Sequence, residues 1–165
     1  MIAIKNILAA TDFSDVAEAA LSYGRTLAEQ FSATLHVVHV VEDIALRAVT
    51  ADGFITVMPE LQRELEEAAR KQLDTALSRV PSRAPKPVAR VVTSNTTAEA
   101  IVTYAREARV DLIVIGTHGR GGMSRLLLGS VAERVVRTAP CPVLTVHHPE
   151  RDFIRPDAPT AGAAA

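Results

Sequence analysis

The sequence is short of the features that mark secreted, zinc-binding, nucleic-acid-binding and membrane proteins. Its single cysteine, Cys141, allows neither an intramolecular disulfide nor a cysteine-based zinc site. Its 18 lysine and arginine residues are offset by 19 aspartate and glutamate residues, which excludes a strongly basic surface for nucleic acid. The apolar start is interrupted by Lys5, so it is too short for a secretory signal or a membrane span. We therefore expect a cytoplasmic protein that binds neither nucleic acid nor membrane.

What the sequence does have is an alternation of two hydrophobic patterns over 165 residues, a length that suits one domain with its own core. Short apolar runs rich in valine and isoleucine alternate with longer segments of helical period. This alternation predicts an α/β fold, with an open and mostly parallel sheet of five strands and helices on both faces. The expected strands are 2–10, 34–41, 88–92, 111–115 and 142–146, and the expected helices are 15–31, 60–80, 97–108 and 131–138. Within 60–80 we expect a buried apolar stripe that includes Leu61, Leu65 and Leu73, and a solvated face of charged residues.

Residues typical of helix caps stand at three of the expected helix starts. Ser14 precedes the first helix, and the pairs Thr96 with Glu99 and Ser130 with Glu133 have the spacing of capping boxes. Each predicts that the serine or threonine hydroxyl caps the helix that follows.

Two segments do not follow the alternation. Residues 42–59 form a long connection with a turn signal at Asp52-Gly53, and such connections are lids, binding loops or disordered segments. Residues 148–165 have low complexity and no apolar period, which predicts a disordered tail. We expect a domain over residues 1–147 with 42–59 as a lid or loop insertion.

Ligands of open α/β sheets bind beyond the carboxyl ends of the strands, which directs attention to the loops at 10–14 and 116–125. The second loop is rich in glycine, carries Arg120 and Arg125, and leads to a helix start at 129–130. Glycines let a phosphate approach the backbone, and the amides of a helix start converge on its oxygens. The pattern favours a phosphate site, although a flexible loop that leads into a capped helix would look the same.

The glycine spacing differs from that of the common phosphate loops. The chain has no G-x-x-x-x-G-K-[ST] motif, and the loop at 10–14 has no glycine where a dinucleotide-binding fold needs G-x-G-x-x-G. The pattern present is G-x2-G-x9-G-S, filled by Gly116, Gly119, Gly129 and Ser130.

With this pattern the chain resembles the universal stress protein family, in particular its ATP-binding branch. The resemblance covers roughly residues 2–147 and rests also on ATDFS at 10–14, GSVAERVVR at 129–137 and APCPVLTV at 139–146. It implies a Rossmann-like sheet of order 3-2-1-4-5 that binds ATP, with Mg²⁺, across the first and fourth strands. It also implies a homodimer that forms through the last strand, Pro142 to Val146.

The resemblance also implies roles for individual residues. Asp12 would hold the ribose hydroxyls, the backbone around Val40 would meet the adenine, and Gly116 would lie against the ribose. A carboxylate can accept hydrogen bonds from two vicinal hydroxyls, although Asp12 could instead cap the following helix. The full set of implied nucleotide-binding residues is Ala10, Thr11, Asp12, Val40, Ile115, Gly116, His118, Gly119, Arg120, Gly129, Ser130, Val131 and Ala132.

Other chemically interesting residues have simpler interpretations. His118 could touch a phosphate or face solvent, while His36 and His39 lie on an expected strand and are interpreted as structural. Cys141 between two prolines is interpreted as a packed side chain rather than a nucleophile. The pair at 147–148 is too isolated to bind a metal, and we assign no catalytic residue and no metal ligand.

The sequence leaves three functions open. The first is an ATP-binding regulatory module of the stress response, with an unidentified protein partner. The second is a slow ATP hydrolase or a phosphoryl- or adenylyl-transfer enzyme, which would need a base near the terminal phosphate. The third is a dimeric adaptor in which nucleotide binding is incidental.

Overall fold

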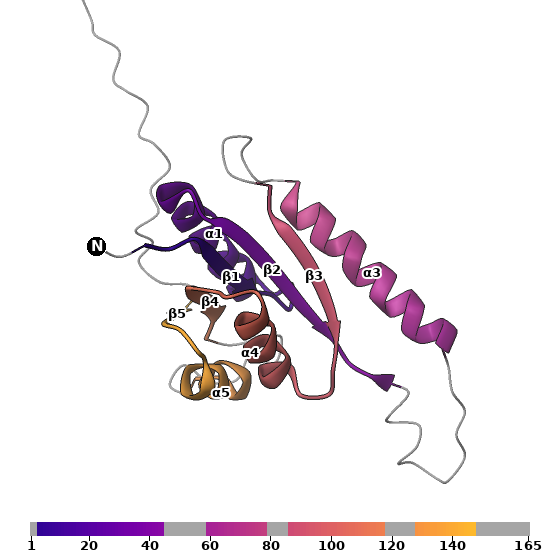
Figure 1. Ribbon diagram of the computed structural model, residues 1–165. Helices are drawn as coiled ribbons and strands as arrows, with labels where there is room; N and C mark the ends of the chain where they lie inside the picture. Colours follow the sequence, from indigo (N-terminus) through magenta and orange to yellow (C-terminus); the bar gives the residue numbers. More distant parts are fainter. Residues whose placement is uncertain (1–2, 45–58, 79–85, 118–127, 148–165) are drawn as a thin grey trace, which may run out of the picture.

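The computed structural model describes residues 3–44, 59–78, 86–117 and 128–147, and within these ranges five strands form one parallel sheet (Figure 1). The strand order is β3-β2-β1-β4-β5. The predicted fold class and strand order are therefore confirmed. The strands are β1 (Asn6–Ala10), β2 (Thr34–Val41), β3 (Val88–Thr93), β4 (Leu112–Gly116) and β5 (Val143–Val146).

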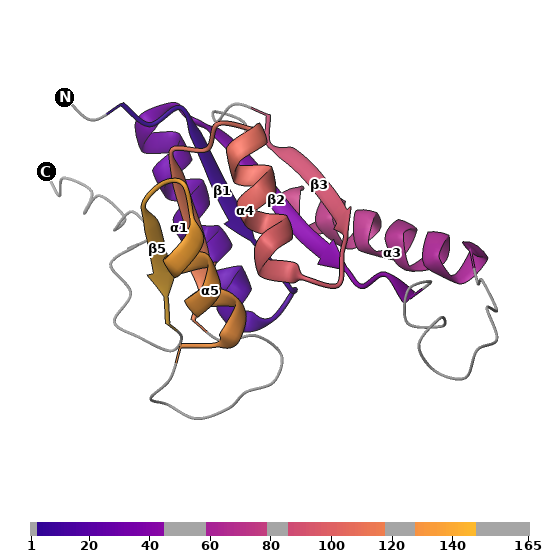
Figure 2. The same cartoon turned by 60° about the horizontal axis from the view of Figure 1, so that its bottom comes forward.

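Helices cover both faces of the sheet, as Figure 2 shows from the side of α4 and α5. They are α1 (Asp15–Phe31), α3 (Pro59–Leu77), α4 (Thr97–Glu107) and α5 (Ser130–Thr138). Successive side chains of a strand point to opposite faces. Ile7 and Ala9 of β1 accordingly pack in the cluster that contains residues of α1 and α3, while Leu8 and Ala10 pack with α4 and α5.

Several element boundaries differ from the expected ones, and two of these differences have local reasons. β1 begins at Asn6, because the Asp111 carboxylate accepts the backbone N–H groups of Lys5 (2.7 Å) and Asn6 (2.9 Å) where the strand starts. The expected loop 42–59 ends before Pro59, which is the first residue of α3. Proline suits that position because its missing N–H would have no acceptor within the helix.

Of the three expected caps, only the one at Ser14 forms, with its hydroxyl accepting the Ala17 N–H at 3.3 Å. Thr96 makes no side-chain cap, and Glu99 forms an ion pair with Arg134 of α5 at 2.6 Å instead. Ser130 is the first residue of α5 rather than its cap, which is Gly129. Both capping boxes are thus wrong.

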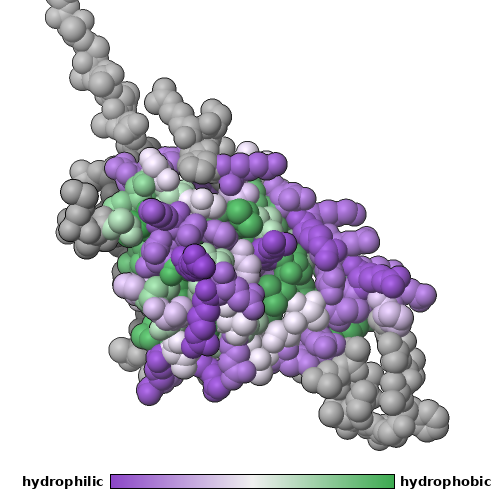
Figure 3. All heavy atoms as spheres, in the orientation of Figure 1, coloured by the Kyte–Doolittle hydropathy of each residue, from purple (hydrophilic) through white to green (hydrophobic). Residues whose placement is uncertain are grey.

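The α3 helix lies beside the edge strand β3 and is only thinly buried. Its buried residues are Ala69 and Leu73, whereas Leu61 and Leu65, expected in the same buried stripe, are 43% and 40% exposed. Figure 3 shows hydrophilic side chains gathered along the α3 side of the molecule. The charged face of this helix is therefore a solvated surface, as its sequence predicts.

Two expectations lie outside the described residues: the insertion, except for its ends at 42–44 and Pro59, and the tail at 148–165. Among the described residues, no helix combines the length and the apolar character needed to cross a membrane.

Candidate functional site

The candidate site lies at the carboxyl edge of the sheet, where β1 and β4 run side by side. β1 pairs with β2 and with β4, so the chain order reverses at β1. The chain leaves β1 into α1 on one face, and α5, which follows β4, packs on the other face. Such a point opens a crevice between the two departing segments. Ala10, Thr11 and Ile115 at these strand ends are buried, with exposed fractions of 7%, 8% and 6%.

The loop after β1 is held by its own side chains. Asp12 Oδ1 accepts the N–H of Ser14 at 3.1 Å and its hydroxyl at 2.6 Å, and Ser14 Oγ accepts the Ala17 N–H. Thr11 Oγ1 accepts the Phe13 N–H at 3.0 Å. Asp12 thus supports the cap of α1 through Ser14, a local role close to the alternative that the sequence left open. Asp12 follows the end of β1 and is half-buried.

Phe13 gives this loop a costly backbone conformation. Its φ of 63° lies in the left-handed region, where a residue with a side chain loses about 1–2 kcal/mol. The Phe13 ring packs on the ring of His39, with centroids 4.4 Å apart. His39 Nδ1 is 2.8 Å from the Thr11 carbonyl oxygen, which can only accept, so Nδ1 carries the proton. His39 therefore holds the loop, which agrees with its interpretation as a structural residue, although the sequence did not predict the contact with Thr11.

The end of β2 turns backbone groups toward the crevice. The Val38 carbonyl accepts the Thr11 N–H on the β1 side, and the Val41 carbonyl accepts the Ser94 N–H on the β3 side. Because backbone groups alternate along a strand, the N–H and C=O of Val40 point to the β1 side. β1 has already ended at Ala10, which pairs with Val38, so these groups face the crevice beyond it.

Gly116, the last residue of β4, lies close to Val16 of α1. A Cβ atom at Gly116 would lie 2.9 Å from Val16 Cγ1 and 3.3 Å from the Val16 backbone. The absence of a side chain at this position is therefore needed for the contact between α1 and β4, independently of any ligand.

The start of α5 presents backbone donors to the same edge. Its N-cap, Gly129, has an extended backbone (φ −60°, ψ 150°) and makes no side-chain cap. A helix start leaves its first N–H groups without acceptors within the helix, here those of Ser130, Val131 and Ala132. Together with the helix dipole, these amides suit an anion. Ala132 is buried in the core, so it can offer only its backbone.

Three of the implied nucleotide-binding residues, His118, Gly119 and Arg120, lie outside the described residues, as does Arg125. The other ten gather at the carboxyl ends of β1, β2 and β4 and at the start of α5. Among the described residues, no group of three or more His, Cys, Asp or Glu side chains could hold a metal ion. A magnesium ion at this edge would accordingly need most of its oxygen ligands from a bound phosphate and water.

The remaining singled-out side chains fall into two groups. Cys141 is half-buried, and burial followed by the nearby Asp111 charge raises the pKa of its thiol, so the nucleophilic thiolate is disfavoured. His36 lies away from the crevice, with Nδ1 2.9 Å from the hydroxyl of Tyr104 in α4. His147, by contrast, reaches the site edge, where its Nδ1 is 3.0 Å from Thr117 Oγ1.

Comparison with known proteins places these features in context. Residues 3–147 match the universal stress protein family. A universal stress protein of Methanocaldococcus jannaschii is 34% identical over 148 residues, which cover 90% of this chain and 85% of that protein.

Solved structures of universal stress proteins are also similar to this chain. UspA of Lactobacillus plantarum has a TM-score of 0.76 at 28% identity, over 88% of this chain and 99% of that one. A universal stress protein solved in complex with cAMP has a TM-score of 0.57 at 25% identity, over 88% and 98%.

Proposed function

The chain belongs to the universal stress protein family, and on this premise we propose that it is a regulatory module that binds ATP between the ends of β1 and β4. The observation that carries the proposal is the meeting of three groups of complementary chemistry at one edge. They are the carboxylate of Asp12, the inward backbone of Val40 and the uncapped start of α5. The complex of a similar universal stress protein with cAMP supports an adenine nucleotide as the ligand.

Each part of the nucleotide has a matching group. The Asp12 carboxylate would accept hydrogen bonds from the ribose hydroxyls, and the Val40 backbone would offer a donor and an acceptor to the adenine edge. The amides of Ser130, Val131 and Ala132 would receive phosphate oxygens. Mg²⁺ would arrive with the phosphates, whose charge it neutralises.

The same groups favour binding over chemistry. Amides at a helix start hold phosphate oxygens in the ground state as well as in a transition state, which strengthens binding without speeding a reaction. Asp12 is engaged with Ser14 and assigned to the ribose, so it is poorly placed as a base for an attacking group. We therefore expect turnover far below the roughly 1–100 s⁻¹ of kinases.

Isothermal titration with Mg-ATP tests the proposal, beside Gly129→Val, which would block approach to the helix start. The negative φ of Gly129 accepts a side chain, so the variant should fold. Ser130→Ala is the matched control, because it keeps the amide and should still bind. ATP at 100 times its dissociation constant should stabilise the wild type by about 2.7 kcal/mol.

Other outcomes would change the assignment. No heat with the wild type would reject ATP binding and leave the adaptor role. Equal binding by Gly129→Val would place the phosphates elsewhere. Phosphate release above about 1 s⁻¹ that is lost in Gly129→Val would make the protein an enzyme.

A further inference from the structure

Thr117, the first residue after β4, joins three segments through its three polar groups. Its N–H donates to the Val146 carbonyl at the end of β5 at 2.8 Å, and its carbonyl accepts the N–H of Gly129, the cap of α5, at 2.7 Å. Its hydroxyl lies 3.0 Å from Nδ1 of His147. Thr117 thus connects the start of α5 with the ends of β4 and β5.

The strand register explains why His147 meets Thr117. Gly116 pairs with Val146, so Thr117 and His147 are the next pair along the two parallel strands. Ile113 and Ile115 of β4 and Val143 of β5 pack on the α4 and α5 face. Because side chains alternate, Thr117 and His147 also point to that face, on which α5 begins.

We infer that His147 is a positioning residue for the nucleotide site: it holds Thr117, whose carbonyl holds Gly129 and thereby places the amides of the α5 start. His147 itself need not touch the ligand. The inference rests on the proposed function and adds a residue that the resemblance does not assign. It also links the edge strand β5 to the phosphate end of the site.

The strength of a hydrogen bond between a backbone amide and a phosphate depends steeply on distance and angle. Amide donors bind a phosphate oxygen well only within about 2.7–3.2 Å and near a straight N–H···O angle. A helix start with no side-chain cap depends on its other contacts for its position, and the Gly129 to Thr117 bond is such a contact. Loss of the imidazole would let Thr117 turn and the amides shift with it.

The test compares ATP with adenosine, which lacks the phosphates, in matched variants. His147→Ala and Thr117→Val should each weaken ATP about three- to tenfold, the factor that one net hydrogen bond represents. Adenosine affinity should change less than about twofold. Thr117→Ser keeps the hydroxyl, and His147→Asn places an amide atom where Nδ1 lies, so both should restore ATP affinity. The double variant should lose no more than one single variant, because both remove the same bond.

A second measurement needs no ligand. The Gly129 amide should exchange with deuterium faster in His147→Ala than in the wild type. The Ile113 amide, bonded to the Pro142 carbonyl at the other end of β5, should be unchanged.

The results separate this inference from the proposed function. A wild type that binds neither ATP nor adenosine would reject both. A wild type that binds ATP, with His147→Ala losing ATP and adenosine equally, would reduce His147 to a structural residue. Unchanged ATP affinity in His147→Ala, or unchanged exchange at Gly129, would also overturn the inference.

Discussion

Gly116 illustrates how a single residue can serve the fold at a position that resemblance assigns to the ligand. The resemblance places it against the ribose, yet its missing side chain already makes room for Val16 of α1. We predict that Gly116→Ala lowers the free energy of unfolding by about 1–3 kcal/mol without nucleotide, because the Val16 side chain is short and stiff and its backbone is also close. Urea denaturation measures the loss.

The double variant with Val16→Ala is the control for this contact. If the two side chains clash, the double variant should be more stable than the sum of the single losses predicts. Strict additivity would show that the cost of Gly116→Ala arises elsewhere.

The residues of the site differ in how far the sequence could predict them. Asp12, Gly116 and Gly129 stand in recognisable motifs, and the structure brings them to one edge. His39 and His147 stand in no motif, because each acts across a strand pair on Thr11 or Thr117. Their roles depend on strand register, which hydrophobic patterning does not set to the exact residue for parallel strands.

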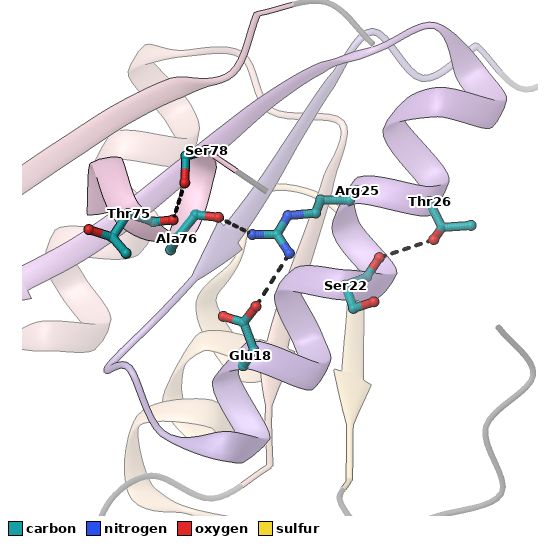
Figure 4. Close-up of polar contacts among 7 residues, drawn as sticks. All are labelled: Glu18, Ser22, Arg25, Thr26, Thr75, Ala76 and Ser78. Carbon is teal, nitrogen blue, oxygen red and sulfur yellow. Dashed lines mark hydrogen bonds and ion pairs between the residues drawn. The ribbon is translucent and has the colours of Figure 1, made fainter. Parts of the chain in front are cut away.

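At the scale of the elements, Arg25 of α1 contacts Ala76 near the end of α3, as Figure 4 shows. The Arg25 side chain, 13% exposed, donates to the Ala76 carbonyl near the end of α3 at 2.5 Å and pairs with Glu18 at 3.3 Å. Its Nε is buried without a partner among the described residues. Since α3 buries few residues, this contact should contribute much of its attachment.

We predict that Arg25→Met lowers the free energy of unfolding by about 1–2 kcal/mol. The variant removes a charged hydrogen bond to the Ala76 carbonyl, and this loss outweighs the relief of the buried Nε. Arg70→Met is the matched control, since its ion pair with Glu66 is exposed and should contribute about 0.3–0.5 kcal/mol. If urea denaturation showed similar losses of stability in both variants, the contact of Arg25 with Ala76 would not be what attaches α3.

A second contact between elements, His36 of β2 with Tyr104 of α4, should make stability depend on pH. Burial, and then the charge of Arg90, lowers the pKa of His36 below its ordinary value of about 6.5. The unfolded chain therefore takes up a proton more readily than the folded one. The contribution of neutral His36 to the free energy of unfolding is therefore full above about pH 6.5, and it is lost as the pH falls from there through the lowered pKa.

The measurement is urea denaturation between about pH 7 and pH 5, with His36→Asn beside the wild type. Asparagine does not titrate and can still bond the Tyr104 hydroxyl, so its stability should fall less over this range. All other titratable groups are shared by the wild type and His36→Asn, so the difference between the two pH profiles isolates His36. Parallel profiles would show that His36 does not contribute.

The elements themselves were predictable where their hydrophobic period is long and strong. The α1 helix and β2 have the expected bounds, 15–31 and 34–41. The capping boxes failed because capping side chains have other partners in three dimensions, such as Arg134 for Glu99. The prediction that Leu61 and Leu65 of α3 are buried was wrong. A helical period shows which side of a helix can be buried, but it does not show how far the neighbouring sheet extends.

For the molecule as a whole, the open sheet leaves two edges, β3 and β5. β3 carries the exposed, charged Arg90 in mid-strand, a feature that discourages pairing with another chain. β5 carries no charged residue, and its Val143 and Leu144 are only half-buried. This contrast supports the dimer through the last strand that the resemblance implies, and it remains a prediction.

The hydrogen-bond pattern identifies which backbone groups such a dimer would use. The carbonyls of Pro142 and Val146 accept N–H groups from Ile113 of β4 and from Thr117, which follows β4. By alternation, the backbone groups of Val143 and Thr145 point to the free edge. Val146 is buried, so a charge there would unfold the chain rather than test the edge.

We predict that the wild type is a dimer at tens of micromolar protein and that Thr145→Pro is a monomer. Proline removes the outward N–H and leaves the bonds to β4 in place, as proline is tolerated on an edge strand. Thr145→Val changes the same exposed side chain but keeps the N–H, so it should remain dimeric. Light scattering measures the mass, and urea denaturation checks that Thr145→Pro folds. A monomeric wild type would refute the dimer, and a dimeric Thr145→Pro that folds normally would place the interface on another surface.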